Sequence, residues 1–346
     1  MASKFARLVG LMGALAPAFA VPTNNSHQVS LPLPARTIVQ MNQTVDFVEN
    51  IAVSGSGDLV VTLFHPTASV YAVEKPLSDS PIMSLLHTFQ DANGTTGIVE
   101  INPGIFVVAT AFYQGLATPV ANTTSFWELQ WGGKGLPATV RRIDHAPKAS
   151  LVNGITSIPG LKSAVLAVDG ALGLIYRVNV ITGVNQVVLD ATELKPVPGS
   201  QLGLGANGIK IRDGYVYWSN TDAVSIYRTL IDSKGYPIRG AKVEKVVTIE
   251  GASGVDDFNF DRQGNIWAAT NLDNTVVTIK PDGRREVVVG SPTELTVAGD
   301  TAVAFGRTAA DKDIVYVTTC GAVASPVNGT ITEPGKIVAI DAKGYY

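Results

Sequence analysis

The sequence predicts an all-β protein, a six-bladed β-propeller with four antiparallel strands in each blade. The first observation is a hairpin pattern that recurs six times: an apolar stretch, a turn with Gly, Asp or Asn, and a second apolar stretch. The second is that two more short strands usually follow each hairpin. The third is length, because without a leader of 20 residues the 346-residue chain gives each of six units about 54 residues, the size of a blade.

The six hairpins follow one another along the whole chain. They read VENIAVSGSGDLVVTLF from Val48, TGIVEINPGIFVVATAF from Thr96, GITSIPGLKSAVLAVD from Gly154, GIKIRDGYVYWSN from Gly208, DDFNFDRQGNIWAATN from Asp256 and TAVAFGRTAADKDIVYVTT from Thr301. The outer strands include SVYAVE, LLHTF, LIYRVNV, NQVVLD, SIYRTLI, KVVTI, TVVTIK and REVVV.

The last unit supplies only KIVAI after its hairpin, so it lacks a fourth strand. We expect residues 37–42, TIVQMN, to serve as this outer strand and to close the ring. A pair of β-sandwiches would also give alternating strands, but it does not predict six equivalent hairpins. No segment after the leader has the pattern of a helix longer than two turns.

The first 20 residues have the pattern of a cleaved signal peptide. Lys4 and Arg7 form a basic start, residues 8–16 are apolar, and Ala18-Phe19-Ala20 is a small-x-small cleavage site. Residues 21–346 would then form a single propeller domain that is secreted or resides in the lumen of the secretory pathway. No other apolar stretch reaches the roughly 18 residues of a membrane span, so none is expected.

Five N-x-[ST] sequons fit a secretory route, because a glycan needs an exposed acceptor. They lie at Asn24, Asn42, Asn93, Asn122 and Asn328. The single cysteine, Cys320, excludes an intramolecular disulfide, and we interpret it as a small apolar residue at a strand end.

The composition excludes two further classes of protein. Hydrophobic residues make up 46% of the chain and charged residues 16%, and the net charge is −3. Disordered chains need a lower apolar content, and proteins that coat nucleic acid need a strong basic excess. We therefore expect a folded domain without a nucleic-acid partner.

Polar residues at the blade starts carry the functional signal, because the first strand of a propeller blade lines the central channel. The residues that precede the first apolar pair of each unit are Glu49, Thr96, Asn153, Asn207, Asp256 and Thr301. Four of them, Glu49, Asn153, Asn207 and Asp256, offer the side-chain oxygens that Ca²⁺ or another divalent cation prefers. The alternative is that they only satisfy amides at strand ends.

The segments around these four residues resemble one family. VENIAV at Glu49, VNGI at Asn153, GANGIK at Asn207 and GVDDFNFDRQGNIWAAT at Asp256 resemble the SMP-30/gluconolactonase-like propellers, most specifically over residues 205–306. The resemblance implies that these four residues are metal ligands and that Asp256 is the catalytic acid or base.

The sequence departs from the family pattern at two places. The Asn-Asp-Gly segment of the family is Asn153-Gly154 here, and its Pro-Asp-Gly segment is Val255-Asp256-Asp257. Because neighbouring residues of a strand face opposite sides, only one carboxylate of the Asp pair is expected to face the channel. The phrases GANGIK, DDFNFD and TAVAFGRT resemble a secreted fungal subgroup that includes hetero-Diels-Alderases of tropolonic sesquiterpene biosynthesis.

The leading functional hypothesis, from this resemblance, is a pericyclase of fungal meroterpenoid biosynthesis that joins a tropolone-type o-quinone methide to a terpene such as humulene. This reaction requires an acid or base, hydrogen-bond donors to the heterodiene and a dry apolar cavity, but no cofactor. The expected catalytic residues are Asp256, His65, Tyr113 and Glu49. The expected binding residues for a small apolar substrate lie at the ends of the second strands and in nearby aromatic walls: Phe64, Phe112, Asp169, Trp218, Asn220, Asn271 and Thr319.

Two alternatives remain open. The first is a lactonohydrolase in which a divalent cation polarises the carbonyl and Asp256 activates water. The second is a binding propeller without catalysis, since a fold does not fix a function. The sequence contains no G-x-S-x-G and no H-E-x-x-H, which disfavours serine-hydrolase and zinc-protease chemistry.

Overall fold

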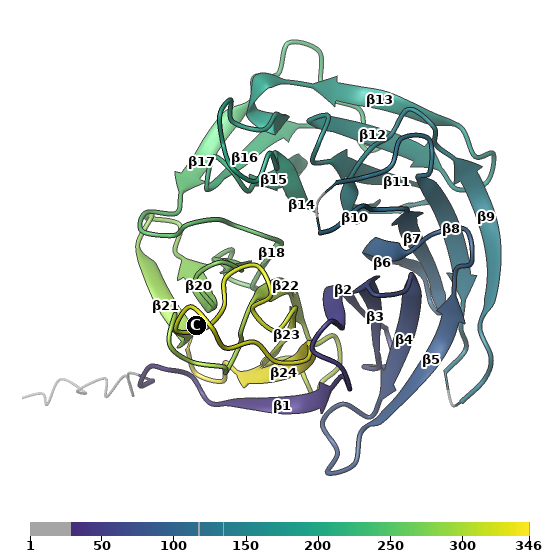
Figure 1. Ribbon diagram of the computed structural model, residues 1–346. Coiled ribbons are helices and arrows are strands. Elements are labelled where there is room, and N and C mark those ends of the chain that lie inside the picture. The colour runs from purple at the N-terminus through teal and green to yellow at the C-terminus, as the bar shows by residue number, and fades with distance from the viewer. Residues whose placement is uncertain (1–28, 117, 134, 346) are drawn as a thin grey trace, which may run out of the picture.

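The computed structural model describes residues 29–116, 118–133 and 135–345, and these form six four-stranded antiparallel sheets around a central axis (Figure 1). Blade 1 consists of β2 (Phe47–Val53), β3 (Leu59–His65), β4 (Ser69–Glu74) and β5 (Ile82–Thr88). Blade 2 consists of β6 (Gly94–Asn102), β7 (Ile105–Ala111), β8 (Ser125–Gln130) and β9 (Thr139–His145). Blade 3 consists of β10 (Val152–Ile158), β11 (Leu161–Asp169), β12 (Leu174–Asn179) and β13 (Asn185–Asp190).

Blades 4 to 6 complete the ring. Blade 4 consists of β14 (Ala206–Arg212), β15 (Tyr215–Asn220), β16 (Ser225–Leu230) and β17 (Glu244–Thr248). Blade 5 consists of β18 (Phe258–Phe260), β19 (Ile266–Ala269), β20 (Thr275–Ile279) and β21 (Arg285–Gly290). Blade 6 consists of β22 (Asp300–Phe305), β23 (Ile314–Thr319), β24 (Lys336–Asp341) and β1 (Ala35–Gln40). One 3₁₀ turn, η1 (Thr192–Leu194), is the single helical element of the described residues. The predicted six-bladed propeller is confirmed.

The ring closes as predicted, with an N-terminal strand that completes the last blade. Strand β1 pairs antiparallel with β24, and Figure 1 shows the two strands side by side although they come from opposite ends of the chain. The strand begins at Ala35, two residues before the predicted start at residue 37. A shift of register between Thr37 and Val39 places Ile38 at a bulge, and its side chain is buried between blades 6 and 1.

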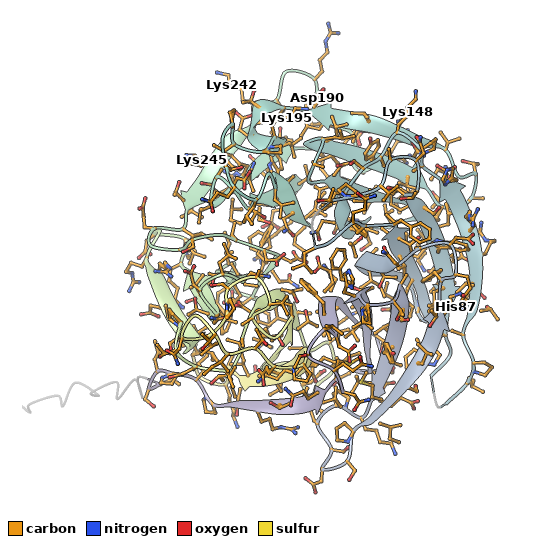
Figure 2. The ribbon with its side chains drawn as sticks, in the orientation of Figure 1. His87, Lys148, Asp190, Lys195, Lys242 and Lys245 are labelled. Atoms are coloured by element: carbon orange, nitrogen blue, oxygen red, sulfur yellow. The ribbon has the colours of Figure 1, made fainter. Side chains whose placement is uncertain are left out.

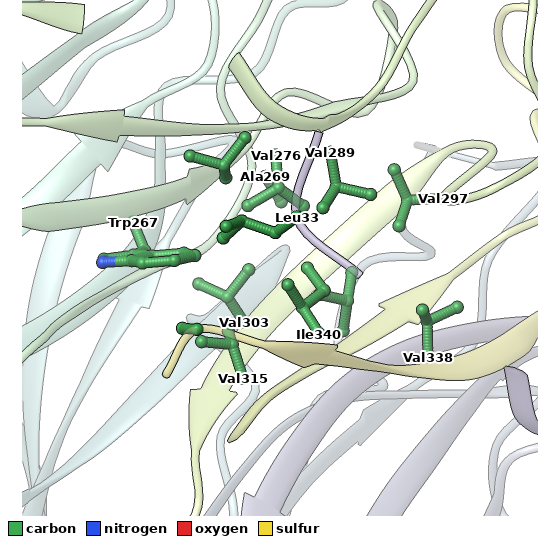
Figure 3. Packing of buried hydrophobic residues seen from close by; sticks show 13 residues of the cluster. Leu33, Trp267, Ala269, Val276, Val289, Val297, Val303, Val315, Val338 and Ile340 are labelled. Carbon is green, nitrogen blue, oxygen red and sulfur yellow. The ribbon is translucent and has the colours of Figure 1, made fainter. Parts of the chain in front are cut away.

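Apolar side chains fill the space between neighbouring blades. In the cluster between blades 5 and 6, Trp267 and Val276 of blade 5 pack against Val303 and Ile340 of blade 6 (Figure 3). Leu33, from the segment that leads into β1, packs into the same cluster. Since one Cys excludes an intramolecular disulfide, these interfaces and the β1–β24 pair carry the stability of the ring.

Charged side chains extend from the outer edge of the disc. Lys148, Lys242 and Lys245 lie there in Figure 2, and Lys195 forms an ion pair of 2.7 Å with Asp190. Exposed pairs of this kind contribute little to stability, so the outer strands serve mainly as solvated edges.

The predicted leader, residues 1–20, and the sequon at Asn24 lie outside the described residues. The side chains of Asn42, Asn122 and Asn328 are exposed. Asn93 differs, because its side-chain amide donates to the carbonyl oxygen of Tyr113 at 2.9 Å and accepts from the N–H of the same residue. Within the part of the chain that is described, no helix has the length and hydropathy of a transmembrane span.

Ile38 tests how strongly ring closure stabilises the protein. We expect Ile38→Ala to lower the free energy of unfolding by about 2 to 4 kcal/mol, because the substitution leaves a cavity in a buried cluster. The measurement is a denaturant titration, with Thr37→Ala in the exposed part of the same strand as control. Equal stabilities of the two variants would contradict a role of this strand in holding the ring.

Candidate functional site

The innermost strands each carry one extra residue that directs a side chain toward the axis. On β14, Ala206 pairs with Asn220 and Ile209 with Trp218, so one more residue lies on the inner strand than on its partner. Equivalent shifts occur on β2, β6, β10 and β22. In blade 5 the N–H of Asp256 and the carbonyl of Asp257 both bond to Ala269, which is the same two-against-one arrangement. Such bulges turn side chains out of the ladder.

The bulged backbone is held by hydroxyl groups of the second strands. Ser219 Oγ accepts the N–H of Gly208 at 2.7 Å and donates to the carbonyl of Asp256, in the next blade, at 2.7 Å. Thr62 Oγ1 does the same in blade 1, where it accepts the N–H of Asn50 at 3.0 Å and donates to the carbonyl of Thr96 at 2.6 Å. Each hydroxyl therefore satisfies a bulge and joins two blades at the channel.

The side chains turned inward in this way form the polar end of a cavity at one mouth of the channel, with a volume of about 120 Å³. Its lining consists of Phe47, Glu49, Phe64, Thr96, Leu116, Leu151, Asn153, Leu202, Leu204, Asn207, Thr221, Gly254, Val255, Asp256, Thr270, Asn271, Leu272 and Ala324. The four predicted oxygen ligands thus meet in one place, and Asn271 joins them.

Two carboxyl groups dominate the electrostatics of this cavity. Burial, followed by the negative charge of Asp256, raises the pKa of Glu49 well above its ordinary value. Burial also raises the pKa of Asp256 to about 7, although Asn271 Nδ2 donates a hydrogen bond of 2.8 Å to its Oδ2. Asp256 can therefore exchange a proton near neutral pH, which suits an acid or base catalyst, and Glu49 retains its proton to a higher pH than an exposed glutamate does.

Two carboxamide side chains of the cavity, Asn153 and Asn207, have oxygen atoms that could accept further hydrogen bonds or bind a cation. Among the described residues, the Oδ1 atoms of Asn153 and Asn207 are buried and have no hydrogen-bond partner, while Asn207 Nδ2 donates to Thr221 Oγ1 at 3.1 Å. Two free carbonyl oxygens beside two carboxyl groups are a donor set that fits a hard divalent cation. In the described part of the chain, no three His, Cys, Asp or Glu side chains gather as a metal site, so such a cation would depend on the two Asn residues.

The structure separates the two carboxylates of the Asp pair. Asp256 lines the cavity beside Glu49, whereas Asp257 lines a second cavity at the other side of the channel. Asp257 forms an ion pair of 2.6 Å with Lys210. The expectation that only one of the two faces the channel is wrong, because the bulge breaks the strand alternation and each carboxylate lines one of the two cavities.

Aromatic rings form one wall of the cavity. Phe64 packs edge-on against Phe47 at 5.3 Å and against Tyr113 at 4.7 Å between ring centroids. Tyr113 is buried behind Phe64, and burial together with the charge of Glu49 raises the pKa of its hydroxyl. A side chain at Gly94 would come within 2.8 Å of the Tyr113 ring, so this glycine makes room for the wall.

Several predicted site residues do not line this cavity. Asp169 accepts four backbone N–H groups of the loops around it, and Asn220 bonds to the carbonyls of Glu193 and Lys195. Trp218 is fully buried in the core between blades 3 and 4.

The remaining predicted residues lie near the mouth but outside the lining. The Thr319 hydroxyl bonds to the backbone of Lys336. His65 is half-buried and packs edge-on against Phe64 at 5.8 Å, and Phe112 is 38% exposed. Cys320 is buried beside Phe64, and burial raises the pKa of its thiol to about 12, which agrees with an apolar packing role.

Comparison with known proteins shows the family of the chain and the proteins that share its fold. The SMP-30/Gluconolactonase/LRE-like region family matches residues 196–321. A protein of Phoma sp named "Putative hetero-Diels-Alderase" is 32% identical over 325 residues, covering 86% of this chain and 88% of the relative. The chain belongs to this hetero-Diels-Alderase family. "Putative hetero-Diels-Alderase asR5" of Sarocladium schorii is 28% identical over 344 residues, covering 91% of this chain and 85% of the relative.

Solved structures share the fold of this hetero-Diels-Alderase family member. A luciferin-regenerating enzyme superposes with a TM-score of 0.64 at 15% identity, covering 90% of this chain and 96% of the other. A regucalcin of Agrobacterium tumefaciens, described as a calcium-binding protein, superposes with a TM-score of 0.61 at 14% identity and the same coverage. At these identities the likeness shows the propeller fold alone. The named relatives support an enzyme of the pericyclase class, and the family match fits a lactonase as second candidate.

Most of the apolar lining of this cavity was not predicted from the sequence. Phe47 begins β2, and the leucines lie on loops from four different blades: Leu116, Leu151, Leu202, Leu204 and Leu272. Loop residues carry no strand periodicity, so the pattern could not place them. The signal that could have marked the bulges is the repeated Thr-Gly-Ile and Asn-Gly-Ile at Thr96, Asn153 and Asn207.

A further carboxyl group, that of Asp300, holds the backbone of Thr270, which lines the cavity. It is fully buried, its Oδ2 accepts the N–H of Thr270 at 2.9 Å, and its Oδ1 has no partner. Burial raises the pKa of Asp300 well above its ordinary value, and the negative charge of Asp256 raises it further. The hydrogen bond from the Thr270 N–H acts in the opposite direction.

Asp300 should make folding stability depend on pH. In the unfolded chain the Asp300 carboxyl group ionises near pH 3.9. In the folded protein its pKa is higher. Between these two pKa values the folded protein therefore holds a proton that the unfolded chain has released. Stability from this group therefore falls as pH rises. We expect Asp300→Asn, which cannot ionise, to show a smaller loss of unfolding free energy between about pH 5 and pH 8.

The control is Asp213→Asn, because Asp213 is exposed and its backbone φ of 50° suits Asn. Denaturant titrations at several pH values give the slopes. If wild type and Asp300→Asn lose stability equally with pH, Asp300 does not titrate as described.

Proposed function

We propose that this protein is a hetero-Diels-Alderase that joins a tropolone-type o-quinone methide to a terpene such as humulene. The observation that carries the proposal is the cavity itself, where apolar walls surround two buried carboxyl groups with raised pKa values. The relatives named hetero-Diels-Alderase support the same reaction class.

Asp256 supplies the proton transfers of the first step. The precursor carries a hydroxymethyl group beside a ring hydroxyl. Protonated Asp256 gives its proton to the hydroxymethyl oxygen, the carbon–oxygen bond breaks and water leaves. The ring hydroxyl returns a proton to the carboxylate, which leaves the neutral o-quinone methide. A pKa of about 7 makes both forms of Asp256 accessible near neutral pH.

Glu49 and the apolar walls serve the second step. Protonated Glu49 donates a hydrogen bond to the ketone oxygen of the heterodiene and lowers the barrier to cycloaddition, in which no proton moves. Phe47 and Phe64 cover the reacting face, and the volume of about 120 Å³ holds only part of both partners. The hydrocarbon therefore extends between the mouth loops, where Leu116 is 44% and Leu202 40% exposed.

The second candidate is a metal-dependent lactonohydrolase, which the unpartnered Oδ1 atoms favour. Asn153 and Asn207, together with Glu49 and Asp256, would hold Ca²⁺ or another divalent cation, which would polarise a lactone carbonyl. The two candidates need opposite protonation states of the same carboxyl groups, because a cation binds carboxylates and the dehydration needs an acid.

We further propose that the protein acts in the secretory pathway or outside the cell and carries glycans at exposed sequons. The leader pattern of residues 1–20 and the exposed side chains of Asn42, Asn122 and Asn328 support this proposal. Its substrates are small molecules.

Asp256→Asn tests the acid role. The amide keeps the shape of the side chain and its place beside Asn271 but transfers no proton. We expect formation of cycloadduct from the hydroxymethyl precursor and humulene to fall by about 10²-fold or more. The measurement is product formation by chromatography above the rate without protein, with circular dichroism to confirm folding. A fully active variant would exclude Asp256 as the acid.

Chelation separates the two candidates. We expect EDTA to leave cycloaddition and its product ratio unchanged, and we expect no chelator-sensitive hydrolysis of aldonolactones. Hydrolysis that EDTA abolishes and Ca²⁺ restores, and that is also lost in Glu49→Ala, would establish the lactonohydrolase instead. Protein that neither hydrolyses aldonolactones nor changes the product ratio would exclude both.

A further inference from the structure

The channel of the propeller contains two cavities that have no lining residue in common. The first is the cavity of Glu49 and Asp256. The second, which we call the polar chamber, has a volume of about 350 Å³ and opens at the other mouth. Glu100, Thr156, Ser157 and Arg307 are among its polar lining residues.

Three side chains line the polar chamber where its residues adjoin those of the first cavity, and we call them the floor: Asn50, Lys210 and Asp257. Lys210 Nζ lies 2.6 Å from Asp257 Oδ1, and Asn50 Nδ2 donates to Asp257 Oδ2 at 3.3 Å. Asp257 Oδ1 also accepts the N–H of Phe258 at 2.7 Å. Only 3% of Asp257 and 5% of Asn50 is exposed.

The floor and the site above it come from the same bulges. Glu49 and Asp256 line the upper cavity, and the residues that follow them, Asn50 and Asp257, line the polar chamber. Room for the Asp257 side chain comes from Gly208, where a Cβ would lie 2.2 Å from Asp257 Oδ1 and 2.9 Å from its Cα.

The hydrogen bonding of the two layers differs. Both carboxylate oxygens of Asp257 have donors, and Asn50 Oδ1 accepts the N–H of Ile51 at 2.9 Å. Above them, Asn153 and Asn207 each retain a buried oxygen without a donor. Acceptors that already have donors hold their side chains in place and need no ligand, whereas buried acceptors without a donor can accept a hydrogen bond from a ligand.

We propose that the floor makes the upper cavity a blind pocket and keeps the water of the polar chamber away from the reacting substrates. This inference rests on the proposed function. An o-quinone methide is attacked by water as well as by an alkene: the water oxygen bonds to the methylene carbon and a proton passes to the ketone oxygen, which restores the hydroxymethyl precursor. The floor therefore sets the partition between cycloaddition and hydration.

The test compares Asp257→Ala with Asp257→Asn. Both remove the same charge beside Glu49 and Asp256, but only the alanine opens a hole, since asparagine keeps the volume and can still accept from Lys210. In water labelled with ¹⁸O, each hydration event leaves ¹⁸O in the recovered precursor, which mass spectrometry measures. We expect label per cycloadduct, corrected for the reaction without protein, to rise severalfold in Asp257→Ala and to stay at the wild-type value in Asp257→Asn.

Asn50→Ala removes a second side chain of the floor but leaves the ion pair between Lys210 and Asp257 intact. It should also raise the amount of ¹⁸O in the recovered precursor. If both alanine variants fold and make cycloadduct with wild-type label, the inference is overturned. If the wild-type protein makes no cycloadduct, the proposed function is overturned instead. Crystal structures of the wild type and of Asp257→Ala then test whether the floor closes the pocket. Ordered waters crossing the floor of the wild type would contradict a blind pocket, and waters crossing it only in Asp257→Ala would support one.

Discussion

The bulge on each innermost strand is the constraint on which the site depends. In a regular strand, successive side chains point alternately into the two apolar layers between blades, so none would face the axis. One additional residue breaks this alternation and releases backbone groups that need new partners. The hydroxyls of Thr62 and Ser219 provide them and bind the neighbouring blade at the same time. Site geometry and ring cohesion therefore share the same hydrogen bonds.

Most of the fold was predictable because a propeller repeats one local pattern. Six hairpins with alternating apolar residues require six similar sheets, and the missing fourth strand of the last unit had one candidate, the segment around Ile38. The start of β1 lies two residues before the predicted one, and its pairing with β24 is irregular, because a bulge interrupts the alternation along the strand. Strand ends are fixed by tertiary pairing more than by local preference.

The site was predictable only in its polar part. Equivalent positions in a repeat converge on one axis, so Glu49 and Asp256 could be found by comparing the units. The leucines of the mouth could not, because their convergence depends on loops whose paths no local pattern determines. Trp218 illustrates a different limit. It lies on a second strand, β15, where an aromatic residue suits a channel wall and the core between blades equally. Only the pleat of the folded strand places it in the core.

The bulged positions have one more consequence, which concerns how such proteins change. The side chains of Asn153 and Asn207 take no part in the strand ladder, so replacing them alters the chemistry of the axis. Thr96 and Thr301 differ, because their hydroxyls donate to backbone carbonyls of the next blade. Asn153 and Asn207 can exchange for other residues while Gly154 and Gly208 preserve the close approach of the next blade. The same scaffold can thus acquire new reactions by single substitutions, provided that the glycines remain.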